Sequence, residues 1–210
     1  GFPVHQKLVP GLKTLIVNAV ECEPGVSADQ ALLEARAPEL VNTFAVLVDV
    51  LQPAEHVFAI AADNLPAQDL LGAAGAEHVA IAPAGHAVGS ERQLVQALTG
   101  VNLARGERPA ARGIACINLG TLSAIADVLL RGLPLTTRVV TVSGTSCTAP
   151  GNYRIPFGTP FAHVANELGR PGTPGAIRMG GVMTGRWTSA NSVVNHSTLA
   201  IELMSSGPTA

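Results

Sequence analysis

The fold of this chain is set first by Lys13-Thr14-Leu15-Ile16-Val17, a short run of mainly apolar and β-branched residues. A run of this kind, without alternating polar positions, is typical of a strand buried on both faces of a parallel sheet. A helical pattern follows over 28–52 and contains Pro38. Because proline is accepted in the first turn of a helix but not inside one, we predict two helices, at 28–36 and 38–52.

Strands and helices continue to alternate as far as residue 133. Further strands are predicted at 56–61, 78–82 and 113–117, and helical segments at 66–71, 89–98 and 121–130. This alternation favours a mainly parallel sheet with helices on both faces. We therefore predict the α/β class, with a Rossmann-like domain over residues 1–134.

The pattern changes at Gly132-Leu133-Pro134, where a second domain is predicted to begin. Two β-rich runs, 139–144 and 153–158, lie on either side of a Pro150-Gly151-Asn152 turn. Two such runs around a breaker predict a hairpin. The hairpin and the helix after it define a small domain at 135–170.

The predicted helix of this small domain has Thr159 as its N-cap, Pro160 at its first position and Leu168 at its end. The remaining residues, 171–210, are rich in Gly, Ser, Thr and Pro, and only 198–204 reads as a strand. We expect this C-terminal segment to pack on the preceding domains.

Composition excludes several classes of protein. The chain has 47% hydrophobic and only 13% charged residues, with a net charge of -2, so it is not an intrinsically disordered chain. Its longest apolar stretch, 44–51, contains Asp49 and is too short to span a membrane. A pI near 6.3 and two lysines offer no electrostatic footprint for nucleic acid. So few charges indicate either tight packing or a surface that is covered by a partner.

Cysteine and histidine spacing predicts no metal centre. The chain has three cysteines, Cys22, Cys116 and Cys147. Because they are odd in number and far apart, they form neither a disulfide framework nor a motif for zinc or an iron-sulfur cluster. A reducing compartment fits them best. Five histidines also lack ligand spacing: His56, His78, His86, His163 and His196. Because the first residue is Gly1 rather than Met, we expect the natural start to be missing or processed.

Four polar or glycine-rich segments are candidates for a binding site. They are Gly1-Phe2-Pro3 with Lys7, then 18–24 after the first strand, 89–91, and 118–121 after the strand ending at Ile117. In open α/β sheets, ligands bind beyond the carboxyl ends of the strands, where these segments would converge. A solvated loop is an equally valid interpretation of Glu21 and Glu23 from composition alone.

In this order and spacing, the four segments resemble the C subunit of the Rnf ion-translocating electron-transport complex. That family is related to the FMN- and NADH-binding subunit of respiratory complex I. The β-β-α unit resembles the soluble-ligand-binding β-grasp domain that follows the flavin domain there, and 179–185 resembles a glycine- and methionine-rich segment of the Rnf protein. The resemblance spans nearly the whole chain.

The resemblance implies an electron-transfer flavoprotein subunit in which FMN accepts hydride from NADH. Electrons would pass to a partner iron-sulfur protein or to a membrane complex, since this chain has no cluster motif. If the chain is active, it is an FMN-dependent oxidoreductase of the NADH dehydrogenase type. The cofactor performs the redox chemistry, so no catalytic acid or base is expected.

The resemblance also assigns roles to individual residues. Gly1 would end the loop around the phosphate and ribityl groups, Lys7 would place a charge near phosphate, and Phe2 would flank the nucleotide. The full cofactor-binding set is Gly1, Lys7, Asn18, Glu21, Ser90, Asn118 and Thr121. The residues expected to contact the nicotinamide nucleotide are Phe2, Glu23 and Glu91.

Two alternatives of other classes remain. The chain begins inside the glycine-rich motif, and Val20 and Ile117 replace polar residues of the complex I protein, which favours a binding or structural subunit that has lost the flavin. Ser90 and Leu8 depart from that protein as well. The second alternative is a quinone- or corrinoid-binding module in the β-grasp domain.

The resemblance implies partners and a location too. Other subunits of an electron-transfer complex would cover part of the weakly charged surface. The location would be cytoplasmic, either free or peripheral on the inner face of the cell membrane. We therefore do not expect the chain to be a lone monomer in its working state.

Overall fold

The computed structural model describes residues 3–83, 85, 88–171 and 175–206, which form two compact units. One unit contains residues 3–22 and 29–134, and the other contains residues 23–28 and 135–206. The backbone therefore passes from the first unit into the second at Glu23 and returns at Asp29.

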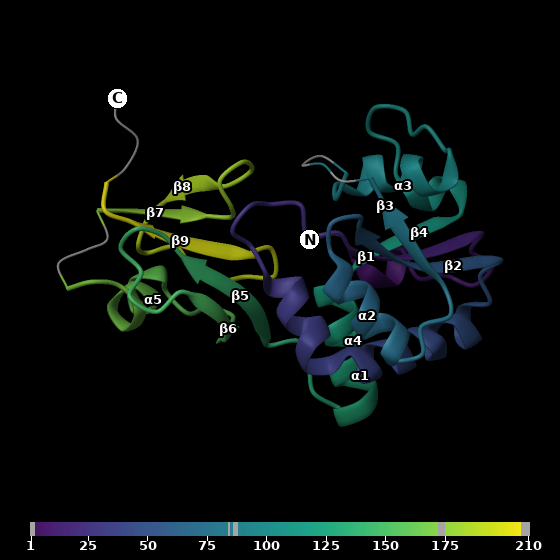
Figure 1. Ribbon diagram of the computed structural model, residues 1–210, viewed down its shortest axis with the longest axis horizontal. Helices are drawn as coiled ribbons and strands as arrows, with labels where there is room; N and C mark the ends of the chain where they lie inside the picture. Colours follow the sequence, from purple (N-terminus) through teal and green to yellow (C-terminus); the bar gives the residue numbers. More distant parts are fainter. Residues whose placement is uncertain (1–2, 84, 86–87, 172–174, 207–210) are drawn as a thin grey trace. The chain divides into compact units, whose positions relative to one another are not determined.

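The first unit is built on a four-stranded sheet in the order β3-β2-β1-β4, and all neighbouring strands are parallel (Figure 1). Its strands are β1 (Thr14–Ala19), β2 (Glu55–Ala61), β3 (Val79–Ala82) and β4 (Ile114–Asn118). Its helices are α1 (Ala28–Leu51), α2 (Leu65–Ala73), α3 (Glu91–Thr99) and α4 (Leu119–Arg131), with short 3-10 turns η1 (Val4–Gln6) and η2 (Pro109–Arg112). The predicted Rossmann-like α/β sheet is confirmed.

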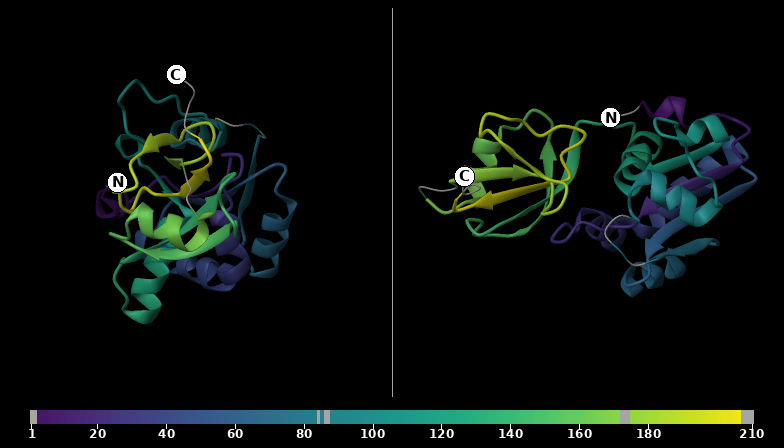
Figure 2. Two further views of the ribbon diagram at one scale, coloured as in Figure 1. Left: turned by 90° about the vertical axis from the view of Figure 1, so that its left-hand side faces the viewer. Right: turned by 90° about the horizontal axis from the view of Figure 1, so that it is seen from above.

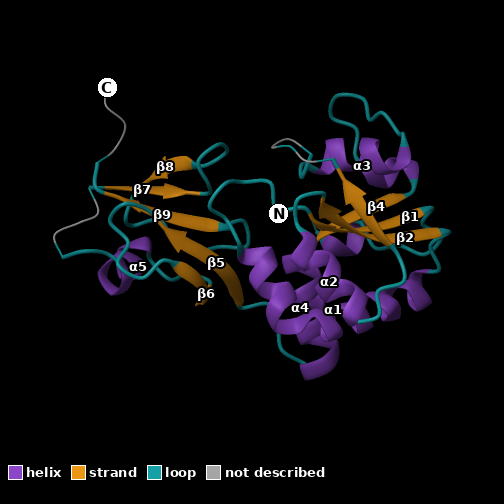
Figure 3. Cartoon of the chain, in the orientation of Figure 1, coloured by secondary structure: helices purple, strands orange, loops and turns teal. Residues whose placement is uncertain are grey.

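Helices cover both faces of this sheet (Figure 3). Helix α3 packs on one face, where Leu94 and Val95 join Ile16, Ala59 and Cys116 in one buried cluster. The opposite face is covered by α1, α2 and α4. The buried strand β1 fits the apolar run of the sequence, because all six of its residues are buried.

Helix α1 has the break that the sequence predicts near Pro38. Arg36 leaves the helical conformation at φ −146° and ψ 16°, directly before the second half of the helix. Its buried guanidinium donates to Glu39, Ser123 and Asp127, which ties the kink to α4. Hydrogen bonds from Arg131 and Arg36 lower the pKa of Glu39 to about 2.

The second unit is a mixed five-stranded sheet in the order β6-β5-β9-β7-β8 (Figure 2). Its strands are β5 (Thr137–Ser143), β6 (Gly151–Pro156), β7 (Ala176–Met179), β8 (Arg186–Thr188) and β9 (Ala200–Met204). A parallel β5–β9 pair lies between two antiparallel hairpins, β5–β6 and β7–β8, and α5 (Phe161–Leu168) packs against the sheet. This is a β-grasp arrangement.

The C-terminal segment differs from its sequence-based description. Residues 135–170 and 171–210 were expected to be separate parts, but strands from both ranges belong to one sheet, because β9 pairs with both β5 and β7. Strands β7 and β8 were not predicted from the sequence. Gly180, at φ 97°, follows β7 in the β7–β8 connection, and an added Cβ there would lie 2.8 Å from Gly185 Cα.

Candidate functional site

The candidate site lies where the order of the parallel strands reverses. The chain passes from β1 outward to β2 and β3, and then crosses back to place β4 on the other side of β1. Beyond the carboxyl ends of β1 and β4 the neighbouring connections therefore diverge, which is where open α/β sheets bind ligands. Several of the residues predicted from the sequence converge at this edge, here called the carboxyl edge.

Lys7 is the central cation of the carboxyl edge. Its ammonium nitrogen donates to Glu91 Oε1 at 2.6 Å and to the Cys116 carbonyl oxygen at 2.9 Å. The Lys7 side chain is only 20% exposed, whereas that of Glu91 is 40% exposed. The predicted cation is therefore anchored on β4 and aligned by the first residue of α3.

Asn18 holds the loop after β1 against the loop before α3. Its amide nitrogen donates to the Gly89 carbonyl oxygen at 2.9 Å, and its amide oxygen accepts from the Val20 backbone nitrogen at 3.0 Å. Gly89 is needed here, since an added Cβ would lie 2.5 Å from Cys22 Sγ and 2.7 Å from the Val20 oxygen. The sequence placed Gly89 in a candidate segment without indicating this close approach.

Cys116 lies directly beneath this group, on β4. Burial, with a further contribution from the Glu91 carboxylate, raises the pKa of the Cys116 thiol to about 12, although the Lys7 charge opposes the shift. The thiol therefore stays protonated at neutral pH. Cys116 serves the site through its carbonyl oxygen and is not a reactive thiolate.

Two helix N-termini point their backbone N–H groups toward the carboxyl edge. Ser90 caps α3 and Asn118 caps α4, both with extended backbone and without a side-chain cap hydrogen bond. Thr121, half-buried, lies in the first turn of α4. The N-terminus of each helix carries the partial positive charge that attracts anions, and neither cap side chain accepts a hydrogen bond from a helix N–H.

Glu21 has a structural partner in this unit. Its carboxylate accepts from the backbone nitrogens of Asp29 and Gln30 at 3.1 Å and 3.2 Å, at the start of α1. The carboxylate thus supplies the N-terminal cap of the longest helix. Its proposed contact with a flavin would have to use the remaining lone pairs.

Glu23 belongs to the second unit. Its carboxylate accepts from the backbone nitrogens of Met183 and Thr184 at 2.6 Å and 3.1 Å and from the Thr184 hydroxyl at 2.8 Å. The side chain packs over Gly181, where no Cβ would fit. The structure therefore gives Glu23 a structural role that the sequence did not suggest. Gly1 and Phe2 lie outside the described residues.

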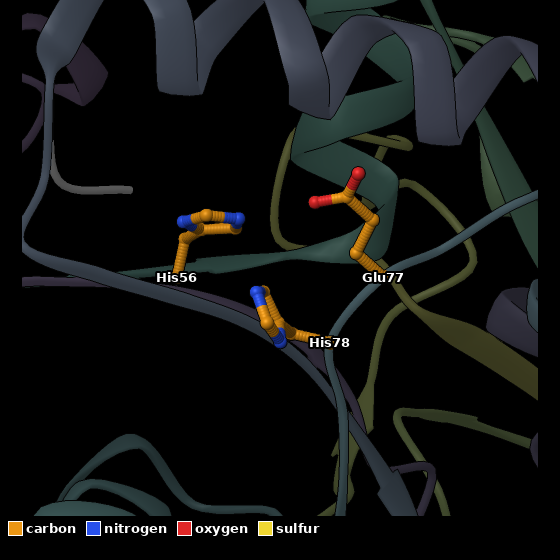
Figure 4. Close-up of side chains that lie close together, drawn as sticks. All are labelled: His56, Glu77 and His78. Carbon is orange, nitrogen blue, oxygen red and sulfur yellow. The ribbon is translucent and has the colours of Figure 1, made fainter.

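His56 and His78, which lack ligand spacing along the chain, lie close together in the structure. Together with Glu77 they place three ligand atoms within 4.8 Å of one another (Figure 4). Parallel pairing of β2 and β3 brings together residues that are 22 positions apart, a proximity that spacing along the chain does not reveal. This cluster lies at the amino ends of the strands, here called the amino edge.

A family model described as the Nuo51 FMN-binding domain matches residues 1–127. The chain belongs to this family. The C subunit of the ion-translocating oxidoreductase complex from Erwinia tasmaniensis is 37% identical over 194 residues, which cover 88% of this chain and 24% of the relative. Its counterpart from Citrobacter koseri is 37% identical over 176 residues, which cover 80% and 25% of the two chains. The chain thus spans about a quarter of the length of these curated relatives.

Two solved structures have a similar fold. The NAD+-reducing NiFe hydrogenase in its air-oxidized state has a TM-score of 0.79 at 20% identity, over 97% of this chain and 43% of that chain. The H2-reduced state has a TM-score of 0.77 at 20% identity, over 90% and 40%. At this identity the likeness shows the fold alone. In the part of the chain that the structure describes, no helix has the length and hydropathy needed to cross a membrane.

Proposed function

We propose that this chain binds FMN at the carboxyl edge and takes part in electron transfer from NADH. The observation that carries the proposal is the position of the Lys7–Glu91–Cys116 group, at the reversal of strand order within a domain whose family is described by FMN binding. The Lys7 ammonium, held in place beside two helix N-termini, suits a ligand with a phosphate group.

The residues at this edge fit the chemistry of FMN. The phosphate needs N–H donors and positive charge, which the N-termini of α3 and α4 and the Lys7 ammonium offer. Asn118, Ser90 and Thr121 have polar side chains at these helix starts and would complete the binding set. Asn18 and Glu21 act as positioning residues, because their polar atoms hold the surrounding loops.

When bound, FMN would supply the chemistry that takes two electrons from a nicotinamide and releases them one at a time. This chain's part is to bind and orient. Lys7 would neutralise phosphate charge while Glu91 fixes the direction of its ammonium, and the close loop contact at Gly89 would keep the edge rigid. Glu91, at 40% side-chain exposure, is the group that would meet the nicotinamide nucleotide.

Electrons would leave through a partner. The only group of three or more metal-ligating side chains within the described residues lies at the amino edge and contains no cysteine. The curated relatives are named as subunits of a complex, and we extend that assembly to this chain. The proposed partner is an iron-sulfur subunit, and the proposed location is peripheral, on the inner face of the cell membrane.

A second function is favoured by the position of Glu23. Three hydrogen bonds hold its carboxylate on the loop at Gly181–Thr184, so the carboxylate already has partners within the second unit. This supports a flavin-binding relay that receives electrons from a partner rather than from NADH. One titration distinguishes the two functions.

The test is anaerobic titration of the purified whole natural protein. We expect one FMN per chain, seen as a flavin absorption band, and bleaching of that band by NADH. Binding of FMN without bleaching would support the relay, and absence of FMN uptake would overturn both. Lys7→Met should weaken FMN binding, and Lys13→Met, which removes the chain's other lysine, is the matched control.

A further inference from the structure

The strongest unassigned feature is the side-chain group His56, Glu77 and His78 at the amino edge. One ligand atom from each residue lies within 4.8 Å of the other two, and the imidazole ring centroids are 4.9 Å apart. Figure 4 shows the two rings close together, with their planes steeply inclined to one another, and the Glu77 carboxylate beside them. Two nitrogen donors and one carboxylate are a common ligand set for a transition metal.

The backbone beneath this group is fixed by the sheet. His56 is the second residue of β2, and His78 directly precedes β3. The Phe58 nitrogen donates to the His78 carbonyl oxygen at 3.0 Å, while the Glu55 nitrogen donates to the Lys13 carbonyl oxygen at 2.8 Å. The Cα positions of His56 and His78 are therefore set by strand pairing. His56 is half-buried, whereas the exposed side chains of Glu77 and His78 can still rotate.

A cavity opens at the same place. It has a volume of 570 Å³ and is lined by the three ligand residues together with Glu55, Leu98 and Thr99. This volume accommodates a metal ion with water or one further ligand. The Glu55 carboxylate adds negative charge to the wall of the cavity, which favours a cation over an anion.

We propose that His56, Glu77 and His78 bind one divalent transition-metal ion of the Zn²⁺ class. Two ligand atoms on a tetrahedral Zn²⁺ lie about 3.4 Å apart, since each bond is about 2.0 to 2.1 Å long. The present spacing within 4.8 Å therefore has to close by at most about 1.4 Å, which rotation of the side chains supplies. Nitrogen donors disfavour Mg²⁺ and Ca²⁺, which prefer oxygen ligands.

A bound ion would connect the outermost strand of the sheet, β3, to its neighbour β2. Strand β3 has only four residues and lies at the edge of the four-stranded sheet, so it has one neighbouring strand, β2. The metal would connect the start of β2 to the residues just before β3. Because a ligand that binds only the folded state stabilises it, Zn²⁺ should raise the melting temperature of the protein.

The test is calorimetric titration of the chelator-treated, untagged protein with ZnCl2. We expect one Zn²⁺ per chain in the wild type. His56→Gln and His78→Gln should each weaken binding at least tenfold, and Glu77→Gln should weaken it by a smaller factor. MgCl2 should give no heat of binding. A crystal soaked in ZnCl2 should show anomalous density between the three side chains.

The controls use residues of the same types elsewhere in the chain. His163→Gln and Glu167→Gln alter exposed positions on α5 and should leave Zn²⁺ affinity unchanged. Far-ultraviolet circular dichroism would verify that each variant is folded. The proposal is overturned if the wild type fails to bind Zn²⁺, or if the folded His56→Gln/His78→Gln double variant binds it as tightly as the wild type.

Discussion

The two edges of the parallel sheet use polar residues in opposite ways. At the carboxyl edge, polar groups are bound to one another: Lys7 to Glu91 and Cys116, and Asn18 to Gly89. At the amino edge, His56, Glu77 and His78 lie close together, but the structure gives no hydrogen bond between their side chains or to other described residues. The first edge is organised before any ligand binds, whereas the second needs an ion to hold its groups in one geometry.

The largest effect should come from crowding the carboxyl edge. Gly89→Ala would place a methyl group 2.5 Å from Cys22 Sγ and 2.7 Å from a backbone oxygen, so the two loops must separate. We expect the free energy of unfolding to fall by about 2 to 3 kcal/mol. FMN binding should also be lost, whereas Zn²⁺ binding at the amino edge should persist. Urea unfolding and the two titrations measure these effects.

Gly72→Ala is the matched control. Gly72 lies in α2, and nothing lies within 4 Å of an added Cβ. Alanine in a helix is favoured over glycine, so this variant should be more stable by about 0.5 to 1 kcal/mol. Equal destabilisation by the two substitutions would contradict the close loop contact at Gly89.

A crossed experiment separates the edges directly. Lys7→Met removes the cation beside two helix N-termini, so FMN affinity should drop about tenfold, or about 1.4 kcal/mol. His78→Gln should change FMN affinity less than about twofold. The converse is expected for Zn²⁺. A shared effect of either variant on both ligands would show that the edges are coupled rather than independent.

The loss of stability at alkaline pH measures how well water is excluded from Cys116 at the carboxyl edge. Since the pKa of Cys116 rises from 9.0 to about 12 on folding, the unfolded thiol loses its proton first, and stability falls as pH rises above 9. Between pH 8 and pH 10 this contributes a loss of about 1 kcal/mol. Cys116→Ala should lose less stability over this interval than Cys147→Ala, the control. Equal losses in urea unfolding would mean that water reaches Cys116.

The smallest effect on stability is expected at Glu23, in the segment 23–28 that follows the loop after β1. Glu23→Gln keeps the shape of the side chain but removes the charge that accepts from Met183 and Thr184. Because these contacts are exposed, the free energy of unfolding should fall by about 0.5 kcal/mol. A large loss of NADH use with unchanged stability would instead assign Glu23 to the nucleotide. Glu34→Gln, on the exposed surface of α1, is the control.

Most of the first unit was predictable because its signals are local. The apolar run at β1, the proline near the kink of α1 and the alternation of strands and helices each depend on neighbouring residues. The second unit was harder to predict. Its strands β7 and β8 are short. They form because β9, which pairs with β5, also pairs with β7, and β7 in turn pairs with β8.

The candidate site also contains residues whose positions the sequence indicated and residues whose partners it did not. Residue type indicated that Lys7, Ser90, Asn118 and Thr121 lie near the ends of parallel strands or at helix starts, and the structure places them there. Residue type could not show that Glu21 caps α1 or that Glu23 packs in the second unit. A carboxylate in a loop has many possible partners, and the fold selects among them.

The sequence by itself determined the α/β class, the family and the polar segments at the carboxyl edge, since periodicity and motif order are properties of the chain. Only the tertiary structure decided which groups meet. Parallel pairing brings His78 beside His56, and the reversal of strand order brings Lys7 to Cys116. Contacts between residues far apart in sequence arise from strand order and register, which no local pattern specifies.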